Sequence, residues 1–365
     1  MRLRRITYEN FRNHRSLTFE PSEGINLLYG PNGSGKTSIL EGIHFCALTK
    51  GFVSATDIES LLFSSDFFLL NGSFIDEQNG LITVKISYTK EKEKQITVNN
   101  SDIKPFSRHI SRIPCITFSP QEIFVVNGAP AERRRFIDSA ICQSDLRYLN
   151  DLIDYRRVLN QRNALLSQMS AMNTFHDDML SLWTENLSRL AASIVHVRLK
   201  FIAVFFNHFN TLYTGLSVNE IPGIIYRSTL GKISEETPVE MLYSLFLQKF
   251  EQTKTQEIMR AQTMTGPHRD DFVFLLNERE IKKYASQGQM RTFLICLKLA
   301  QYQYFLEILG EKPICLLDDM FSELDRSRCL DVFSILENCG QTIITSAEKR
   351  SHRNINLISM SSLHH

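Results

Sequence analysis

Residues 30–37 read Gly30-Pro31-Asn32-Gly33-Ser34-Gly35-Lys36-Thr37 and match every fixed position of the pattern G-x-x-x-x-G-K-[ST]. They follow a short apolar segment, residues 25–29, and precede a run of helical period that continues to about Leu48. The glycines let successive backbone N–H groups point at phosphate oxygens where the helix begins. Lys36 adds positive charge for the β- and γ-phosphates, and the hydroxyl of Thr37 can ligate Mg²⁺. The sequence therefore predicts a nucleotide site that begins at Gly30 and ends at Ser38.

A second apolar segment ends in two carboxylates. It reads Pro313-Ile314-Cys315-Leu316-Leu317-Asp318-Asp319. The carboxyl ends of parallel strands open onto the crevice where a phosphate loop lies. We therefore expect Asp318 to hold Mg²⁺ and Asp319 to polarise the water that attacks the γ-phosphate. The alternative is a strand that merely ends in two solvated acids.

Length and composition restrict the remaining possibilities. A chain of 365 residues with 43% hydrophobic and 22% charged side chains is globular, and forms either two domains or one domain with an insertion. The 41 basic and 40 acidic residues nearly cancel, which excludes a polybasic nucleic-acid coat but not a local basic patch. The densest apolar run, residues 201–206, is much shorter than the roughly 18 residues that a membrane helix needs. With no signal-peptide core after the start, we expect a cytoplasmic protein.

The cysteines are expected to be buried and reduced. There are seven, an odd number, and none stands in a Cys-x-x-Cys pair, so neither a disulfide framework nor a zinc site is predicted.

Strand-like and helical patterns alternate in the first and last thirds of the chain. Residues 3–8 and 16–19 are expected to pair, and residues 81–88 and 95–98 alternate as in a β-hairpin. In the last third, residues 271–276, 313–317 and 341–345 resemble strands, and a helix is expected over 286–309.

The middle third is helical in period. One stripe of apolar residues recurs at steps of three and four: Leu187, Leu190, Ile194, Val197 and Phe201. Two long helices would return on each other as a hairpin around a polar break near residues 173–174. We therefore predict an α/β domain split in sequence by a helical arm, with the first part at 1–120, the arm at 121–255 and the last part at 256–365.

Three further motifs resemble those of ABC and SMC-like ATPases. Residues 285–291, ASQGQMR, open a helix and resemble the ABC signature, normally L-S-G-G-Q. Residues 321–325, FSELD, lie just past the two acids and resemble the ABC D-loop. Residues 4–15, which include Arg12 within the segment NFRNH, resemble the amino-terminal stretch of SMC-like ATPases.

Together with these motifs, the sequence resembles the RecF family of bacterial recombination mediators. The similarity extends through nearly the whole chain in family order, over the blocks 118–120, 128–130, 133–138, 159–166 and 266–271. The resemblance implies an ABC-type P-loop ATPase head with an inserted α-helical lobe, which binds ATP and Mg²⁺. It also implies a role in recombinational gap repair and replication restart, with weak ATP hydrolysis that DNA stimulates.

In that family pattern the catalytic site is complete only in a dimer. ATP held by Lys36, Thr37 and the Arg12 stretch of one subunit would be capped by the other subunit's signature, here Ser286, Gly288 and Gln289. Asp325 would lie at the dimer seam, and the alternative for Ser286 is a plain helix N-cap.

Two positions depart from the ABC or family pattern. Gln121 is the candidate for the Q-loop residue, but the family usually has an acid there, which leaves an ordinary exposed side chain as the alternative. The ABC switch histidine has no counterpart, since the final strand ends Thr345-Ser346-Ala347, so a hydroxyl is expected to contact the γ-phosphate instead.

Basic residues near the arm are the candidate DNA contacts. They are Arg133, Arg134, Arg135, Arg147, Arg156, Arg157 and Arg162. Such groups would neutralise phosphates without reading bases, which favours double-stranded or gapped DNA. The alternative is pairing with acids on the same surfaces, namely Glu132, Asp145, Asp151 and Asp154. RecR-like and RecO-like partners are implied only by the family resemblance.

Other ATPase classes share part of this pattern. An ABC-type ATPase subunit of a membrane-associated or defence complex would have the phosphate loop and signature, but not the inserted helical hairpin with these blocks. A long SMC arm is excluded because a helix of about 35 residues spans only roughly 50 Å.

Overall fold

The computed structural model describes residues 1–53, 56–172, 177–217, 219–323, 326–349 and 354–363. Two compact units make up the chain, and the first is discontinuous in sequence. It contains Met1–Ile123 and Arg291–His365, and the second contains Phe124–Met290. The expected arm, residues 121–255, falls in the second unit except for its first three residues, and the segment 256–290 belongs to that unit as well.

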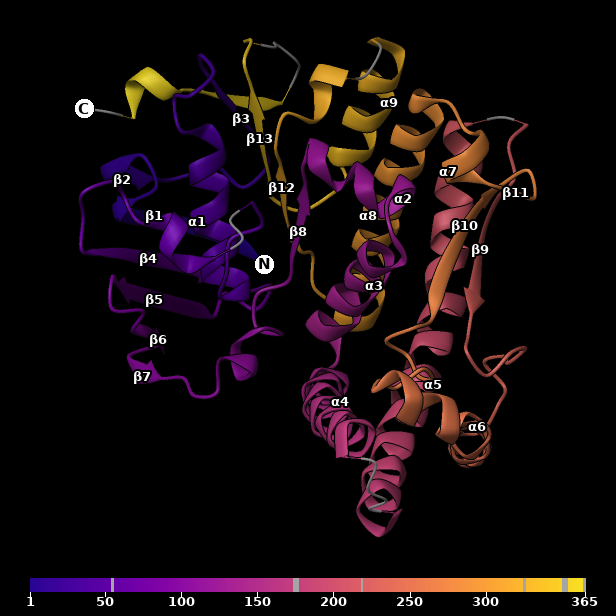
Figure 1. Ribbon diagram of the computed structural model, residues 1–365. Helices are drawn as coiled ribbons and strands as arrows, with labels where there is room; N and C mark the ends of the chain where they lie inside the picture. Colours follow the sequence, from indigo (N-terminus) through magenta and orange to yellow (C-terminus); the bar gives the residue numbers. More distant parts are fainter. Residues whose placement is uncertain (54–55, 173–176, 218, 324–325, 350–353, 364–365) are drawn as a thin grey trace. The chain divides into compact units, whose positions relative to one another are not determined.

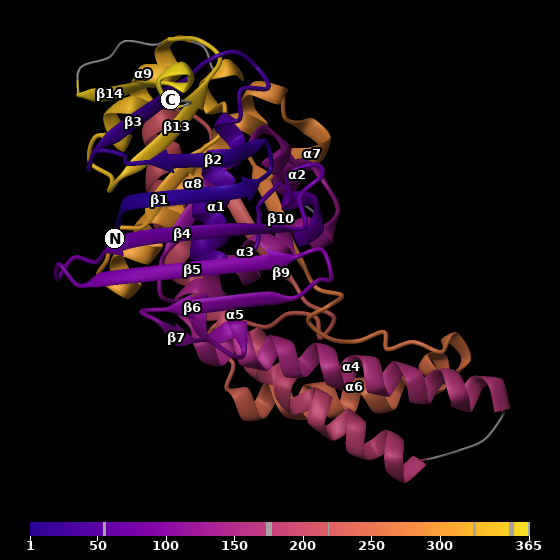
Figure 2. The ribbon, with the colours of Figure 1, turned by 90° about the vertical axis from the view of Figure 1, so that its left-hand side faces the viewer.

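A six-stranded antiparallel sheet forms one layer of the first unit, in the order β2-β1-β4-β5-β6-β7 (Figure 2). Both expected hairpins are confirmed, since β1 pairs with β2 and β5 pairs with β6. Inward-facing apolar residues alternate with polar ones along β1, so one face of the sheet is covered and the other is polar. The strands are β1 (Arg2–Phe11), β2 (His14–Phe19), β4 (Phe67–Ile75), β5 (Leu81–Thr89), β6 (Lys94–Val98) and β7 (Ser101–Asp102).

A parallel five-stranded sheet forms the second layer, in the order β14-β3-β13-β12-β8 (Figure 1). The apolar segments singled out in the sequence are its central strands, which are almost fully buried. The strands are β3 (Ile25–Tyr29), β8 (Cys115–Phe118), β12 (Ile314–Leu317), β13 (Thr342–Ser346) and β14 (Ile355–Ser359).

Helix α1 (Lys36–Leu48) lies in the shared core of these two sheets. It contacts β1, β4 and β5 of the antiparallel sheet and β8, β12 and β13 of the parallel one. Its apolar residues, including Ile39, Leu40 and Ile43, are buried in that core. Because α1 is packed on both sides, the loop that precedes it is held at a defined place on the parallel sheet.

Short helices and two longer ones complete the first unit. The short 3₁₀ helices are η1 (Asp57–Ser60), η2 (Phe106–His109), η3 (Pro120–Ile123), η4 (Met320–Glu323) and η5 (Met360–Ser362). Helix α9 spans Arg326–Leu336, and α8 (Gln287–Leu309) begins in the second unit and continues into the first.

The second unit combines long helices with a small sheet. The predicted hairpin is confirmed as α4 (Leu146–Met172) and α5 (Asp177–Leu216), which pack together with α6 (Val239–Arg260) (Figure 2). The sheet has the order β11-β10-β9, and its strands are β9 (Pro222–Arg227), β10 (Asp271–Leu276) and β11 (Arg279–Glu280). The remaining helices are α2 (Phe124–Asn127), α3 (Pro130–Ser144) and α7 (Ile281–Tyr284).

Helix α5 corrects the expectation that no segment of the chain is long and apolar enough to cross a membrane. It contains an 18-residue window of mean hydropathy 1.5, so by length and composition it could span a membrane. No long uninterrupted apolar run marks this helix, because isolated polar residues break the run without removing the overall apolar character. Length and composition do not distinguish such a helix from a core helix, and α5 packs against α4, α6 and β9. Its buried residues also include Arg198, paired with Asp138 at 2.9 Å.

All seven cysteines are free thiols, and all but Cys339 are buried. Burial raises the pKa of Cys142 to about 12, which keeps this thiol protonated and unreactive.

Candidate functional site

The phosphate loop connects β3 to α1 through a tightly packed turn. Gly33 and Gly35 have left-handed φ angles of 81° and 92°. A Cβ on Gly35 would lie 2.6 Å from atoms of both the Asn13 and His14 side chains. Glycine is therefore required at Gly35 both by the backbone conformation and by the close approach of the β1–β2 turn.

The side chain of Lys36 folds back into this loop. Its Nζ donates hydrogen bonds to the carbonyl oxygens of Gly30 at 2.7 Å and Pro31 at 2.9 Å. Burial lowers the pKa of Lys36, and the nearby carboxylates of Asp319 and Asp318 act in the opposite direction. The ammonium group is thus held where phosphate oxygens could replace the two carbonyls.

Thr37, Asp318 and Thr345 form one hydrogen-bonded cluster. The Thr37 hydroxyl donates to Asp318 Oδ1 at 2.8 Å, and the Thr345 hydroxyl donates to the same oxygen at 2.7 Å. The backbone N–H of Asp319 donates to Thr345 Oγ1 at 2.9 Å, and Asp319 has a positive φ of 45°. Burial raises the pKa of Asp318, and the two hydroxyl hydrogen bonds partly offset this rise. The cluster connects α1 to the ends of β12 and β13.

A cavity of about 810 Å³ lies over this cluster. Residues that the sequence singled out contribute much of its wall: Arg12, Asn32, Gly33, Gly35, Lys36, Thr37, Ser38, Gln121, Asp318, Asp319, Thr345 and Ala347. The rest of the wall has Asn13, Ser119 and Pro120, which belong to segments that carry the family resemblance, and Val53, Glu59, Leu61 and Phe63, to which the sequence assigned no role. The tertiary fold therefore brings the amino-terminal stretch, the phosphate loop and the two acids to one cavity.

The position of Gln121 can be compared with that of its neighbour Glu122. Gln121 is exposed on η3 and lines the cavity. The carboxylate of Glu122 is instead paired with the Lys298 ammonium and accepts a hydrogen bond from the Ser119 backbone at 2.9 Å. Gln121 is therefore the one of these two side chains that faces the cavity.

A buried carboxylate that sequence reasoning missed supports Arg12. Glu41 on α1 is 1% exposed and accepts a hydrogen bond from Arg12 Nε at 2.6 Å. Its other oxygen accepts the backbone N–H of Val53 at 3.2 Å. Glu41 thus holds two residues of the cavity wall. The signal in the sequence was a single acid inside the otherwise apolar run of α1.

The signature segment belongs to the second unit and begins α8. Ser286 Oγ accepts the backbone N–H of Gln289 at 3.2 Å, and Gln289 Oε1 accepts the backbone N–H of Ser286 at 2.7 Å. This reciprocal pair is a capping box, which satisfies backbone donors that the first helical turn leaves unpaired. Gly288 follows Gln287 in that first turn. Asp325, expected at a dimer seam, lies outside the described residues.

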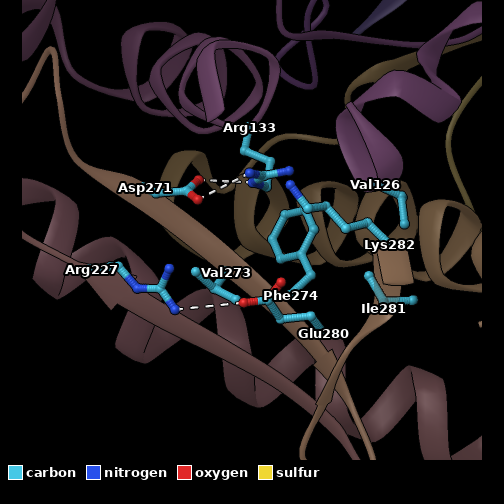
Figure 3. Close-up of a pocket in the computed structure, with 9 residues that line it drawn as sticks. All are labelled: Val126, Arg133, Arg227, Asp271, Val273, Phe274, Glu280, Ile281 and Lys282. Atoms are coloured by element: carbon cyan, nitrogen blue, oxygen red, sulfur yellow. Dashed lines mark hydrogen bonds and ion pairs between the residues drawn. The ribbon is translucent and has the colours of Figure 1, made fainter. Parts of the chain in front are cut away.

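Two of the expected DNA contacts are buried inside the second unit. Arg133 donates to both carboxylate oxygens of Asp271, at 2.9 and 3.0 Å (Figure 3). Arg162 is 1% exposed and pairs with the fully buried Glu257 at 2.7 Å. Neither guanidinium can reach a phosphate in this conformation, because each lies on the buried side of its helix. The expectation of direct DNA contact is corrected for these two residues.

The other basic residues differ in exposure and pairing. Arg134 donates to the carbonyl of Asp270 at 2.7 Å. Arg135 pairs with Glu132 at 2.9 Å and Arg157 with Asp154 at 3.0 Å, so the alternative of local ion pairs holds for these. Among the residues that the structure describes, Arg147 and Arg156 are exposed on α4 with no ion-pair partner.

Two of the four acids proposed as alternative partners make other contacts. Asp145 accepts the backbone N–H of Arg147 at 2.8 Å, and Asp151 accepts the Ser193 hydroxyl at 2.5 Å. Among the described residues, neither of these two carboxylates forms an ion pair with the exposed Arg147 or Arg156.

Comparisons with known proteins show which family this chain resembles. A family model described as an AAA domain matches residues 5–204. The DNA replication and repair protein RecF of Chlorobium phaeovibrioides is 57% identical over 96% of this chain and 95% of its own length. The protein of the same name from Chlorobaculum tepidum is 47% identical, over 99% of this chain and 98% of its own.

Solved structures extend the comparison to the fold. The recombination mediator protein RecF-ATPrS of the RecFOR pathway superposes with a TM-score of 0.91 at 30% identity, covering 98% of this chain and 96% of its own. A structure of the SmcHead bound to the C-winged helix domain of ScpA has a TM-score of 0.54 at 12% identity, over 95% of this chain and 90% of that one, and shares the fold alone. The α/β fold with an inserted helical lobe is thus the ABC-type head fold that the sequence predicted. The chain belongs to the RecF family.

Proposed function

We propose that this protein is an ATPase of DNA replication and repair, which binds DNA in an ATP-dependent homodimer and releases it on slow hydrolysis. The observation that carries the proposal is the cluster of Thr37, Asp318 and Thr345 beneath the phosphate-loop cavity. Relatives named DNA replication and repair protein RecF, and a solved structure described as RecF-ATP, support both the role and the nucleotide.

The residues present fit a magnesium ion that arrives with a nucleotide. Thr37 and Asp318 offer neighbouring oxygen donors of the kind Mg²⁺ prefers, and Asp318 is largely removed from solvent. No group of three or more His, Cys, Asp or Glu side chains among the described residues could hold a metal alone, so phosphate oxygens would complete the coordination. When bound, Mg²⁺ would neutralise charge that develops on the phosphates.

The remaining groups of the cavity have roles that follow from their positions. Lys36 would exchange its loop carbonyls for β- and γ-phosphate oxygens, and Asp319 would orient and polarise the attacking water. Gln121 would contact that water from η3, and Thr345 would take the place of the missing switch histidine. Arg12, supported by Glu41, would bind the nucleotide from the β1–β2 side.

The dimer is proposed from the signature at the start of α8. Ser286 is exposed, no acceptor among the described residues takes its hydroxyl hydrogen, and the positive end of the α8 dipole lies beside it. We propose that Ser286, Gly288 and Gln289 of one subunit cap the γ-phosphate bound by the other, with Asp325 at the seam. ATP would then be required for association.

DNA binding is proposed through exposed guanidinium groups of the arm. Arg147 and Arg156 are the strongest candidates, followed by Arg134, Arg135 and Arg157, and Arg133 and Arg162 are withdrawn because they are buried. Contacts of this kind suit double-stranded or gapped DNA, and a role on DNA agrees with a cytoplasmic location. The RecFOR pathway named for the solved relative supports RecO-like and RecR-like partners in recombinational gap repair.

One experiment tests the proposal directly. Light scattering of the purified protein should show dimer formation on addition of ATP and Mg²⁺ but not of ADP. Binding to gapped, duplex and single-stranded DNA should then be measured with and without ATP across salt concentration. A protein that stays monomeric with ATP, or whose DNA affinity ignores nucleotide, would exclude the ATP-closed clamp.

A further inference from the structure

A single carboxylate, Glu220, connects the end of α5 with the start of α8. Its Oε2 accepts a hydrogen bond from the Tyr213 hydroxyl at 2.7 Å. Its Oε1 accepts a hydrogen bond from Nε2 of Gln289, also at 2.7 Å. All of these residues lie in the second unit, so the contacts belong to one packed body.

Tyr213 and the backbone next to Glu220 are both held in place by the packing of the second unit. Tyr213 is fully buried on α5, the longest helix of the arm. Immediately after Glu220, Ile221 exchanges two hydrogen bonds of 2.8 Å with Asn277, which lies in the turn between β10 and β11. The backbone that follows Glu220 is thus tied to the sheet, and its carboxylate is held by the hydrogen bonds from Tyr213 and Gln289.

Glu220 also determines which way the Gln289 amide faces. A carboxylate can only accept hydrogen bonds, so it selects the NH₂ end of the amide. The amide oxygen then faces the Ser286 backbone, where it closes the capping box at 2.7 Å. With the amide reversed, its NH₂ group would meet the Ser286 N–H and the capping box would open.

We propose that Glu220 is a positioning residue, which presets the signature segment for an incoming phosphate and ties it to the arm through Tyr213. This inference rests on the proposed function, in which residues 286–289 cap a nucleotide held by a second subunit. In this proposal Glu220 makes no contact of its own with the nucleotide. Its effect passes through Gln289 to the first turn of α8, whose N–H groups and Ser286 hydroxyl would receive the γ-phosphate. A displacement of α5 would be transmitted to the same turn through the hydrogen bond between Tyr213 and Glu220.

The test compares variants of the full chain. Glu220→Ala is expected to weaken ATP-induced dimerisation and to slow hydrolysis about ten- to a hundredfold, the usual scale for losing a hydrogen bond to a charged group. Binding of a fluorescent ATP analogue by the monomer should stay within about twofold of wild type, because the phosphate loop is untouched. Tyr213→Phe should give a smaller loss of the same kind. Glu220→Gln should restore most of the activity, because its amide oxygen can still accept from Gln289. Glu236→Ala, an exposed carboxylate of the same unit, is the matched control.

A mixing experiment separates positioning from a general loss of structure. Glu220→Ala retains its phosphate loop, and Lys36→Ala retains its signature, so a mixed dimer contains one complete site. Hydrolysis should therefore recover on mixing, although each variant alone is deficient. If Glu220→Ala fails to fold, Tyr213→Phe carries the test, because it removes only a hydroxyl.

The outcomes distinguish this inference from the proposed function. Wild-type protein that does not dimerise with ATP would overturn the proposed function. Wild-type protein that dimerises, with Glu220→Ala and Tyr213→Phe behaving identically to it, would overturn the role of Glu220 alone. Deficient variants that regain nothing on mixing would also overturn it, since the defect would then not lie in a signature supplied to another subunit.

Discussion

The hydroxyl of Thr37 lies 2.8 Å from a carboxylate oxygen of Asp318, although 281 positions separate the two residues in the sequence. Thr37 lies in the first turn of the helix that follows β3, and Asp318 comes directly after β12, which is separated from β3 in the sheet by β13. The parallel arrangement brings the carboxyl ends of these strands to one edge of the sheet. That single contact assembles the nucleotide cavity from the first and last parts of the chain.

The adjacent acids should have separable effects. Asp319→Asn should retain ATP binding but reduce hydrolysis about 10²-fold or more, because the group that polarises water is lost. Asp318→Asn should instead raise the Mg²⁺ concentration needed for nucleotide binding. A third variant, Lys36→Arg, alters the phosphate loop and should impair ATP-induced dimerisation. Phosphate-release assays and nucleotide titrations over a range of Mg²⁺ measure these effects. Wild-type hydrolysis in Asp319→Asn would rule out its role.

Ser286→Arg should block association without affecting the monomer's own nucleotide site. A bulky cation at the start of α8 would obstruct the approach of a second subunit and oppose the helix dipole. Light scattering with ATP should show monomers only, whereas titration with a fluorescent nucleotide should give an unchanged dissociation constant. Dimers of this variant formed with ATP would contradict the proposed interface.

The buried and exposed ion pairs of the arm should differ strongly in their effect on stability. Arg162→Met leaves the fully buried Glu257 unpaired and should lower the free energy of unfolding by about 3–5 kcal/mol. The matched control is Arg189→Met, whose pair with Glu185 is exposed and is expected to contribute about 0–1 kcal/mol. Urea unfolding of both variants measures the difference. Equal losses of unfolding free energy in the two variants would mean that burial does not set the contribution of the Arg162–Glu257 pair.

The exposed arginines of α4 should govern the salt dependence of DNA binding. Replacing Arg147 and Arg156 by Ala removes two cations that have no ion-pair partner among the described residues. The slope of log affinity against log salt should become shallower by about 1.8, close to 0.9 per lost phosphate contact. Fluorescence anisotropy with a duplex at several salt concentrations gives the slope. Arg227→Ala, which removes an exposed cation paired with Glu280, serves as the control. An equal change of slope in this control would contradict the proposal that α4 contacts DNA.

Mild acid should destabilise the protein through a buried histidine. Burial lowers the pKa of His268 from 6.5 to about 4, and its Nδ1 accepts the Tyr155 hydroxyl at 2.7 Å. Between these values the unfolded chain binds the additional proton, so the free energy of unfolding falls as the pH drops from about 6.5 to 4. This one histidine changes the free energy of unfolding by up to about 1.4 kcal/mol per pH unit.

Thermal melting at pH 7 and pH 5 tests this behaviour. His268→Gln should melt at a lower temperature than wild type at pH 7 but should show a smaller difference between the two pH values. Burial also lowers the pKa of His44 to about 4. Because both proteins contain His44, its contribution to the pH dependence of melting is the same in each. An unchanged pH difference in the variant would assign the effect to other groups.

Much of the head could be predicted because its signals are local. The phosphate loop, β3 and the extent of α1 follow from a glycine pattern between an apolar run and a helical period. The hairpins of the antiparallel sheet follow from alternation of apolar and polar residues. In each case the decisive neighbours are only a few residues apart, so periodicity and backbone conformation suffice.

Other features depend on partners that are distant in sequence. Arg162 and Arg147 both lie on α4, yet one is buried against Glu257, 95 positions away, and the other faces solvent. The apolar period of α4 places Arg162 within the buried stripe and Arg147 outside it, but it does not say which distant carboxylate will pair with the buried guanidinium. For the same reason the pairing of Arg12 with Glu41 and the contact of Glu220 with Gln289 could not be predicted.

Local patterns in the sequence were enough to predict a nucleotide-binding loop, two carboxylates at the end of a strand and an inserted helical arm. These features are set by local backbone preferences and hydrophobic period. The tertiary structure alone decided which charged side chains are buried in pairs and which line the cavity. The reason is physical: a buried charge is stable only beside an opposite charge or several hydrogen bonds. That partner is determined by how helices and strands far apart in the chain pack against one another.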